Sequence, residues 1–264
     1  MIYQRASALP GKRRLRAQLR RTDVLLASFP RSGNTWLRFL LADLIVEGQE
    51  AFPTDIVELN KVICDYHKGL GEPRLLPHRI VKVHEPHPGT PHRFVALVRR
   101  PEDALVSYFH YHRLHDNLID RTQAGIDQFV RASLSSWIWN VQSYLDATNS
   151  GHPGILATYE DLSTSPESTV KSICDFIGIS ATSQQISAAV ERRTFRRLRQ
   201  AEGTRTLHPT EAAPPIKSEK FFRKGEVGSG KAELTHETVE FIIRRTEALY
   251  DAVAQMASDA AGDG

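Results

Sequence analysis

The sequence predicts an α/β fold in which a parallel β-sheet is flanked by helices within a single domain. Short apolar runs rich in β-branched residues alternate with segments of helical periodicity, a pattern typical of strands joined by helical crossovers. The 264 residues suffice for one large domain, at about 100–200 residues per domain. We place that domain at residues 23–256, between a basic arm of residues 1–22 and a tail of residues 257–264, both expected to be flexible.

Four short runs are predicted to be buried strands, at residues 23–29, 79–83, 93–98 and 154–158. The first leads into a predicted helix over residues 34–46, whose apolar residues share one broad face. Pro101 and the two acids after it indicate another helix start, because proline suits the first helical position and acids favour the positive helix end. Further helices are expected around residues 137–145, from Pro166 to Gly178, and after a Thr182/Gln185 capping box.

The net charge of +3 is unevenly distributed. Seven of the 34 basic residues lie in residues 1–22, which hold no acid. The remainder of the chain therefore contains 27 basic and 31 acidic residues. A slightly acidic body argues against nucleic acid as a partner. The arm is either solvated or a peripheral contact to an anionic surface.

No stretch reaches the ~18 apolar residues of a membrane span. The two cysteines have no metal-binding spacing, and so few cysteines favour the cytoplasm.

The sharpest motif is residues 29–36, FPRSGNTW, between the first strand and its helix. A glycine turn at a helix N-terminus exposes backbone N–H groups to an anion. The motif therefore indicates a phosphate cradle without the Walker A spacing. An ordinary capped turn is the alternative.

Two further segments place polar residues at strand ends, where α/β sheets bind ligands. Arg99 ends one strand and Ser107 lies about two turns into the next helix, which suits a phosphate as well as a structural ion pair with Glu102 or Asp103. Lys82 and His84 project to one side of another strand, and a histidine near its usual pKa can accept a proton. An ordinary polar histidine is the alternative. The histidines at 110, 112 and 115 match no common zinc spacing, so no metal is expected.

A long segment rich in proline, threonine and charge, residues 200–220, is predicted to be a mobile lid loop. The FFRKG run at residues 221–225 follows it, and its cation pair before glycine is suited to closing over an anion. The arginines at 192, 193, 196, 197 and 199 are interpreted as a solvated helix face.

Taken in order, these segments resemble the nucleotide-dependent sulfotransferases, most closely the cytosolic type that uses 3′-phosphoadenosine 5′-phosphosulfate (PAPS). The resemblance spans roughly residues 23–240 and implies a P-loop-like fold. Residues 30–36 are similar to the family's P-K-S-G-T-T-W loop, with Arg31 in place of lysine. Lys82 and His84 are similar to the K-x-H segment in which histidine is the catalytic base. The YEDL run at residues 159–162 and the F-x-R-K-G run also match family segments.

The resemblance implies a role for each matching residue. Arg31, Lys82 and His84 are the expected catalytic residues. The residues expected to bind PAPS are Arg31, Ser32, Gly33, Asn34, Thr35, Trp36, Arg99, Ser107, Tyr159, Thr194, Phe195, Phe222, Arg223, Lys224 and Gly225. The expected reaction is transfer of a sulfuryl group to a hydroxyl, less often an amine, of a small-molecule, sugar or lipid acceptor.

The variable segments at residues 47–80, 108–125 and 200–220 are expected to hold the acceptor, and their histidines and tyrosines favour a polar one. The dimer signature K-x-x-x-T-V-x-x-x-E has a counterpart with His236 in place of valine, which leaves monomer and homodimer open. Two alternatives to a sulfotransferase are a kinase-like phosphotransferase and a non-enzymatic module that binds polyanions through the arm.

Overall fold

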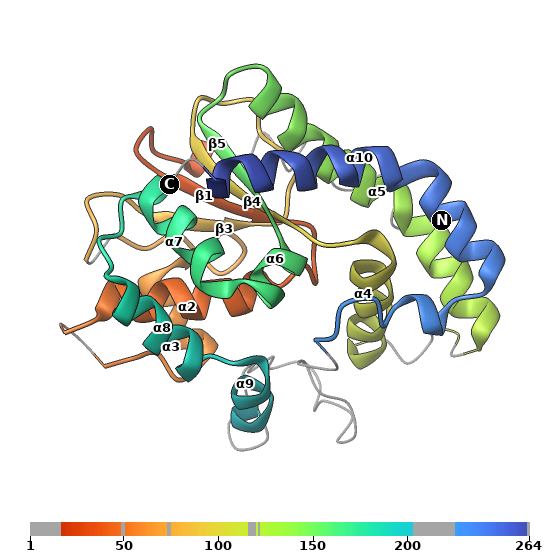
Figure 1. Cartoon of the computed structure of the whole chain (residues 1–264), viewed down its shortest axis with the longest axis horizontal. Coiled ribbons are helices and arrows are strands. Elements are labelled where there is room, and N and C mark those ends of the chain that lie inside the picture. The colour runs from red at the N-terminus through yellow and green to blue at the C-terminus, as the bar shows by residue number, and fades with distance from the viewer. Residues whose placement is uncertain are drawn as a thin grey trace.

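Five parallel strands form the central sheet, in the order β2-β3-β1-β4-β5 (Figure 1). The computed structural model describes residues 17–48, 51–72, 75–115, 120, 122–202 and 225–262. The strands are β1 (Val24–Ser28), β2 (Cys64–Asp65), β3 (Ile80–Val83), β4 (Arg93–Val98) and β5 (Gly154–Thr158). The parallel sheet that the sequence predicts is confirmed.

The register aligns the carboxyl ends of all five strands at one edge. Val24 of β1 pairs with Ile80 of β3 and with Arg93 of β4, and every neighbouring pair runs parallel. The residues that follow the strands are therefore delivered to the same edge, where open α/β sheets bind their ligands.

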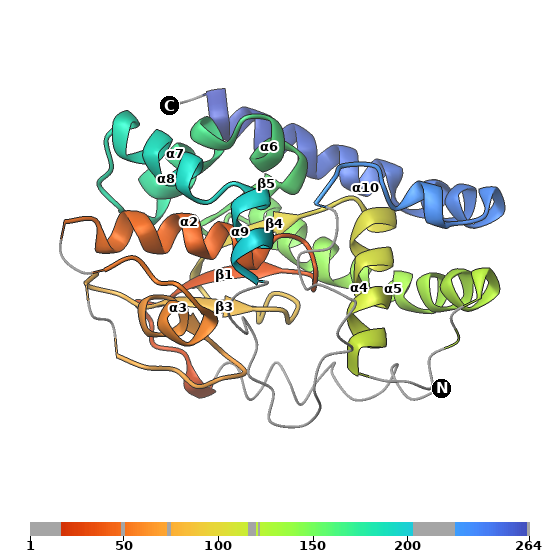
Figure 2. The ribbon, with the colours of Figure 1, turned by 90° about the horizontal axis from the view of Figure 1, so that it is seen from below.

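Helices cover both faces of the sheet because its strands alternate their side chains between two apolar cores. Val24 and Leu26 of β1 belong to one core, and Leu25 and Ala27 to the other. The first core is covered by α2 (Asn34–Val46), α3 (Ile56–Val62), α6 (Tyr159–Thr164), α7 (Pro166–Ile177) and α8 (Ser183–Arg192). Helix α2 packs against β1 and also against α7 and α8 (Figure 2).

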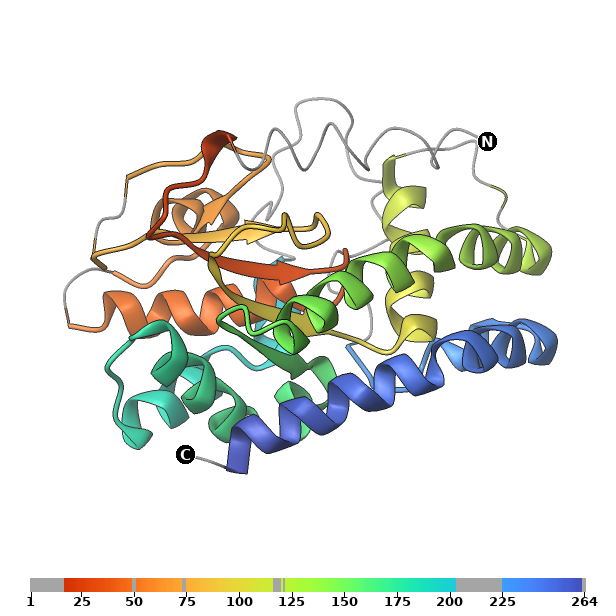
Figure 3. The same ribbon diagram turned by 90° about the horizontal axis from the view of Figure 1, so that it is seen from above.

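The second core is covered by α4 (Pro101–His115), α5 (Gln123–Asn149) and α10 (His236–Gly262). Helices α5 and α10 lie side by side along the sheet (Figure 3). A short helix, α9 (Phe195–Glu202), and a 3-10 turn (Lys231–Glu233) complete the described elements.

Local signals set most of the helix boundaries. Helix α7 ends at Gly178, whose φ of 83° is the left-handed conformation that glycine adopts easily. Helix α8 begins with the expected capping box, in which Thr182 and Gln185 each bind the other's backbone N–H. Strand β2 and helix α3 were not predicted, because a two-residue strand and a seven-residue helix carry too little periodicity to be read.

Both predicted chain ends differ from the structure. Helix α10 continues to Gly262, so the segment assigned to a tail from residue 257 is helical as far as the structure describes it. Residues 17–22, assigned to the arm, contact the domain. Leu19 packs against the second core, and the Arg20 carbonyl accepts a hydrogen bond from His92. Residues 1–16 lie outside the described part of the chain.

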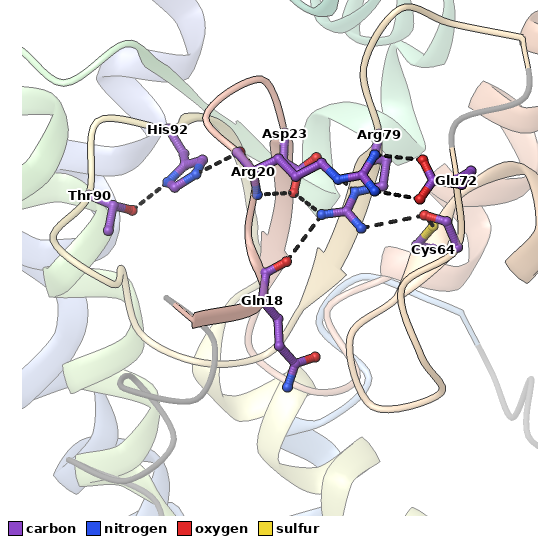
Figure 4. Close-up of polar contacts among 9 residues, drawn as sticks. Gln18, Arg20, Asp23, Cys64, Glu72, Arg79, Thr90 and His92 are labelled. Carbon is purple, nitrogen blue, oxygen red and sulfur yellow. Dashed lines mark hydrogen bonds and ion pairs between the residues drawn. The ribbon is translucent and has the colours of Figure 1, made fainter.

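A polar cluster at the amino end of the sheet connects residues 17–22 to the domain (Figure 4). Arg79 donates to both oxygens of Asp23, at 2.9 and 2.5 Å, and to the carbonyl of Gln18 at 3.2 Å. Both side chains of the ion pair are almost fully buried. Arg20 forms a second, solvent-exposed ion pair with Glu72.

We expect Asp23→Asn to lower the free energy of unfolding by about 3–5 kcal/mol, because it leaves a buried guanidinium without its anion. The matched control is Glu72→Gln, which removes the exposed pair and is expected to change stability little. Urea denaturation of both variants measures the difference. Equal losses would show that burial of the Arg79 pair does not matter.

Candidate functional site

A cavity of about 420 Å³ lies at the carboxyl edge of the sheet. It is lined by residues that follow β1, β2, β3, β4 and β5, together with parts of α2, α3, α4 and α9. The lining residues are Pro30, Arg31, Gly33, Asn34, Thr35, Trp36, Arg38, Ile56, Asp65, His67, Lys68, Lys82, His84, Arg99, Asp103, Ser107, Tyr108, Tyr111, His112, Tyr159, Phe195, Gly225 and Ser229.

The loop between β1 and α2 holds Arg31 in an unusual backbone conformation. Its φ of 68° is left-handed, which costs a residue with a Cβ atom on the order of 1–3 kcal/mol. The conformation directs the side chain toward α4, where its Nε donates to the Ser107 hydroxyl at 3.2 Å and its guanidinium lies 5.3 Å from the Tyr111 ring centroid. The loop thus joins two residues that the sequence assigned to PAPS.

Gly33 is required here by a close approach as well as by its φ of 94°. A Cβ atom at this position would lie 2.5 Å from Cδ2 of Tyr159, the residue that follows β5. The Tyr159 hydroxyl donates to the Gly225 carbonyl at 2.8 Å, and Gly225 in turn has no space for a Cβ beside the Phe195 ring. Trp36 packs edge-on against Tyr159. These aromatic rings form one wall of the cavity.

The N-terminus of α2 is suited to an anion. It has no side-chain cap and no acidic residue in its first turn, so its N–H groups and the positive end of the helix dipole are not neutralised locally. Among the described residues, buried Ser32 Oγ and Arg99 Nε have no hydrogen-bond partner. Buried polar atoms without partners are rare and costly, so both are consistent with binding to a ligand.

Arg99 follows β4 and is nearly buried. Its guanidinium lies 4.1 Å from the Tyr159 ring centroid and donates to the carbonyls of Arg31, at 3.4 Å, and Glu226, at 3.2 Å. The nearest acid, Asp103, is 3.8 Å away and accepts two shorter bonds, from the N–H groups of Gly228 and Gly230. The ion pair with Asp103 therefore neutralises only part of the Arg99 charge, and the guanidinium can still bind a phosphate.

Lys82 and His84 line the cavity from the end of β3, as their spacing predicted. Lys82 Nζ is 2.9 Å from Asp65 Oδ2. Burial lowers the pKa of Lys82, although Asp65 opposes the shift. Burial raises the pKa of Asp65, but Lys82 and Arg38 together bring it below its usual value.

The ring of His84 is fixed by the chain. Its Nδ1 is 2.9 Å from the Ser28 carbonyl, which can only accept, so Nδ1 carries the hydrogen and Nε2 carries the lone pair. Burial, and then the charge of Lys82, lowers the pKa of His84 to about 3. The imidazole is therefore neutral near pH 7.

A second histidine, His67, lies beside His84, although the sequence did not indicate this neighbour. His67 lines the cavity and its Nε2 lies 3.2 Å from Glu85 Oε1, while Glu85 Oε2 accepts the backbone N–H of His84 at 3.1 Å. The sequence assigned His67 only to an acceptor segment. No local pattern could pair it with Glu85, because the strand and loop between them are brought together only by the fold.

The other expected residues fall into four groups. Asn34 lies inside the fold, where its amide donates to the Leu26 carbonyl and to the Ser28 hydroxyl. Thr194 accepts from the Arg197 N–H at the start of α9 and is not part of the lining. Of the acceptor-segment aromatic residues, Tyr66 and His110 do not line the cavity. The lid segment beyond residue 202, together with Phe222, Arg223 and Lys224, lies outside the described residues.

Two arginines interpreted as a solvated face are engaged in the fold, which corrects that interpretation. Arg192 and Arg193 both bind Asp43, which is completely buried in α2. The carbonyl of Arg193 accepts the Trp36 indole N–H at 2.7 Å. The pair with Asp43 therefore positions an aromatic wall of the cavity.

We expect Gly33→Ala to lower the free energy of unfolding by about 2–5 kcal/mol, from the left-handed φ and the clash with Tyr159. Gly48→Ala is the matched control, because Gly48 has a φ of 73° but nothing within 4 Å of its Cβ position. That variant is expected to lose only about 1–2 kcal/mol. Thermal and urea unfolding compare them, and equal losses would contradict the contact with Tyr159.

The described residues contain no group of three or more His, Cys, Asp or Glu side chains placed to hold a metal ion. In the same part of the chain, no helix combines the length and apolar character that crossing a bilayer requires.

Comparisons with known proteins agree with this geometry. Sulfotransferase 1A1 of Bos taurus is 24% identical over 241 residues, which cover 81% of this chain and 78% of that protein. The crystal structure of retinol dehydratase in complex with retinol and PAP superposes with a TM-score of 0.67 at 20% identity, covering 88% of this chain and 82% of the other. Mouse sulfotransferase SULT7A1 complexed with PAP gives a TM-score of 0.64 at 19% identity, and the match covers 94% of this chain and 91% of the other.

The family comparison extends over the whole of the predicted domain. The model of the sulfotransferase domain matches residues 21–256. Together with the parallel sheet, this match confirms the fold and the enzyme class that the sequence motifs predicted. The chain belongs to the sulfotransferase domain family.

Proposed function

We propose that this sulfotransferase transfers the sulfuryl group of PAPS to a hydroxyl, less often an amine, of a polar small-molecule, sugar or lipid acceptor. One observation carries the proposal. A single cavity joins an uncapped helix N-terminus, two arginines and a neutral histidine with a free Nε2 lone pair. The donor PAPS supplies the activated sulfuryl group, and two solved relatives of the same fold contain its product PAP.

The donor half of the site lies over β1, β4 and β5. Trp36, Tyr159 and Phe195 present aromatic surfaces suited to adenine. Arg99 and Ser107 are proposed to bind the 3′-phosphate, together with Arg223 and Lys224. The residues at positions 32–35 are proposed to bind the 5′-phosphosulfate at the N-terminus of α2.

Charge stabilisation is the main requirement of the transfer, because negative charge develops on the leaving phosphate oxygen. Arg31 and Lys82 are proposed to stabilise that charge. The acceptor oxygen forms a bond to sulfur, the bond from sulfur to the phosphate oxygen breaks, and PAP leaves with its electron pair. The acceptor proton passes to Nε2 of His84.

His84 is suited to this role through its fixed tautomer. The Ser28 carbonyl holds Nδ1–H, so Nε2 accepts. The low pKa keeps the ring neutral before transfer. Negative charge on the bound donor lies beside the ring and favours its protonated form, which strengthens the base when substrates are present.

The acceptor half lies over β3 and β2 and is completed by residues of α4. Its lining includes His67, Tyr108, Tyr111 and His112, which are polar-aromatic rather than purely apolar. This supports a polar acceptor over a steroid. We also propose a cytoplasmic location, supported by the two free, buried cysteines. His236, which stands in place of the valine of the dimer signature, is exposed, so a monomer and a homodimer both remain open.

The direct test is a titration with PAP with and without Mg²⁺, followed by assays of labelled PAPS with an acceptor panel. A sulfotransferase binds PAP without the metal and labels an acceptor. A phosphotransferase would need Mg²⁺ and ATP, and a polyanion module would lose its binding when residues 1–22 are deleted. Failure to bind PAP would overturn the proposal.

We expect His84→Ala to reduce turnover by about 10²–10⁴ while leaving PAP affinity nearly unchanged, because a general base acts on the acceptor proton. Arg99→Ala should instead weaken PAP binding by about 1.5–3 kcal/mol, the value of a charged hydrogen bond. Calorimetry and steady-state kinetics separate the two effects. Arg100→Ala is the control, because Arg100 packs over Tyr250 outside the cavity. An unimpaired His84→Ala enzyme would refute the assignment of the base.

We expect Arg31→Ala to lower turnover more than PAP affinity, because Arg31 stabilises charge that develops during transfer. Arg31→Lys should retain substantial activity, since it keeps the cation and restores the residue of the family motif. The measurements are kcat and the Kd of PAP. If Arg31→Lys folds and binds PAP but is inactive, the guanidinium contact with Ser107 is itself required.

A further inference from the structure

The sheet order divides the cavity into two halves, and His84 belongs to the half formed by β3 and β2. The loop after β1 and the residues after β4 and β5 form the half proposed for the donor. Strands β3 and β2 lie on the other side of β1 and deliver Lys82, His84, Asp65, His67 and Lys68. The residues that follow β2 therefore border the acceptor, close to the base.

His67 is held in a defined orientation at this border. Its Nε2 donates to Glu85, whose other oxygen is fixed by the backbone N–H of His84. The His67 ring lies 6.5 Å from the His84 ring, centroid to centroid, with an interplanar angle of 26°. Glu85 uses Nε2, so Nδ1 is the nitrogen that can bind an acceptor, and no described residue binds it.

The charges around His67 leave this half of the cavity positive. Asp65 is committed to Lys82 and Glu85 to His67. Lys68, the next residue in the lining, has no acidic partner among the described residues. Lys68 is a cation beside His67, and the protonated form of His67 would add a second one, so this border is suited to a negatively charged ligand.

We propose that the acceptor carries an anionic group, a carboxylate, sulfate or phosphate, which His67 and Lys68 bind while His84 takes the proton of a nearby hydroxyl. This inference rests on the proposed function and names its substrate class. It assigns His67 and Lys68 to acceptor specificity and Glu85 to the positioning of His67.

The electrostatics of the site agree with the proposal. The hydrogen bond to Glu85 raises the pKa of His67, with burial and Lys82 opposing and Asp65 assisting, so His67 gains cationic character near pH 7. The groups that face it are Glu85, Asp65 and Lys82, together with the rings of His84 and Tyr66. An acceptor anion held here would also favour protonation of His84 during transfer.

The test compares charged acceptors with neutral derivatives of the same compounds. The probes are 4-hydroxyphenylacetate with its amide, methyl glucuronide with its amide, and 4-hydroxybenzylphosphonate with its diethyl ester. Calorimetry measures the binding of each probe to enzyme saturated with PAP, and kinetics measures its sulfation. We expect at least one acid to bind about tenfold or more tightly than its neutral partner, as a charge-assisted hydrogen bond implies.

Variants identify the residues responsible. His67→Gln and Lys68→Gln should each reduce the preference for the acid, while Lys61→Gln removes a cation outside the cavity and should not. Because the charge of His67 is present below its pKa and lost above it, the preference should weaken as pH rises. Glu85→Gln should move that loss to lower pH by removing the partner that raises the pKa of His67.

The outcomes separate this inference from the proposed function. If no acid is preferred, or if the preference survives in both His67→Gln and Lys68→Gln, the inference is overturned, even where neutral acceptors are sulfated. If the acids bind preferentially through His67 and Lys68 but PAPS sulfates none of the probes, the anion site stands and sulfuryl transfer to these acceptors fails.

Discussion

The contact between Gly33 and the Tyr159 ring is the constraint on which the rest of the site depends. The ring occupies the space that a side chain at position 33 would need. With the ring in this place, Arg99 stacks on it and binds the Arg31 carbonyl, and the Tyr159 hydroxyl binds the Gly225 carbonyl. Because Gly33 has no Cβ atom, the residues after β1, β4 and β5 can meet in a single cavity.

Buried carboxylates organise the charges around this contact. Asp43 holds two arginines, Asp103 holds the N–H groups of Gly228 and Gly230, and Asp65 holds Lys82. Gly230 is itself pressed against α4, since a Cβ there would lie 2.4 Å from the Glu102 carbonyl oxygen. That contact gives a physical reason for glycine at position 230. The carboxylate next to Arg99, Asp103, lies 3.8 Å from its guanidinium and is held by the N–H groups of Gly228 and Gly230 at shorter distances.

The two halves of the cavity differ in how they are built. The donor half depends on backbone groups and on rings packed against glycines, features that a short motif in the sequence encodes directly. The acceptor half depends on side chains from β2 and β3 and from α4. Its character follows from which of those side chains find partners in the fold, and Glu85 changes the chemistry of His67 although Glu85 does not itself line the cavity.

The sequence by itself determined the parallel sheet, the glycine loop before α2, the placement of Arg99, Lys82 and His84 at strand ends, and that of Ser107 in the helix after β4, because each depends on local periodicity or on spacing within a few turns. Tertiary structure alone decided which distant polar groups pair. Asp43 and Arg193 are 150 residues apart, and no local pattern relates them. The same holds for the buried pair of Lys82 with Asp65 and for the half-exposed pair of His67 with Glu85, since the fold alone brings these side chains together. The enzyme class could therefore be predicted from the motifs, whereas the pairing of the polar groups around His84 follows only from the packed structure.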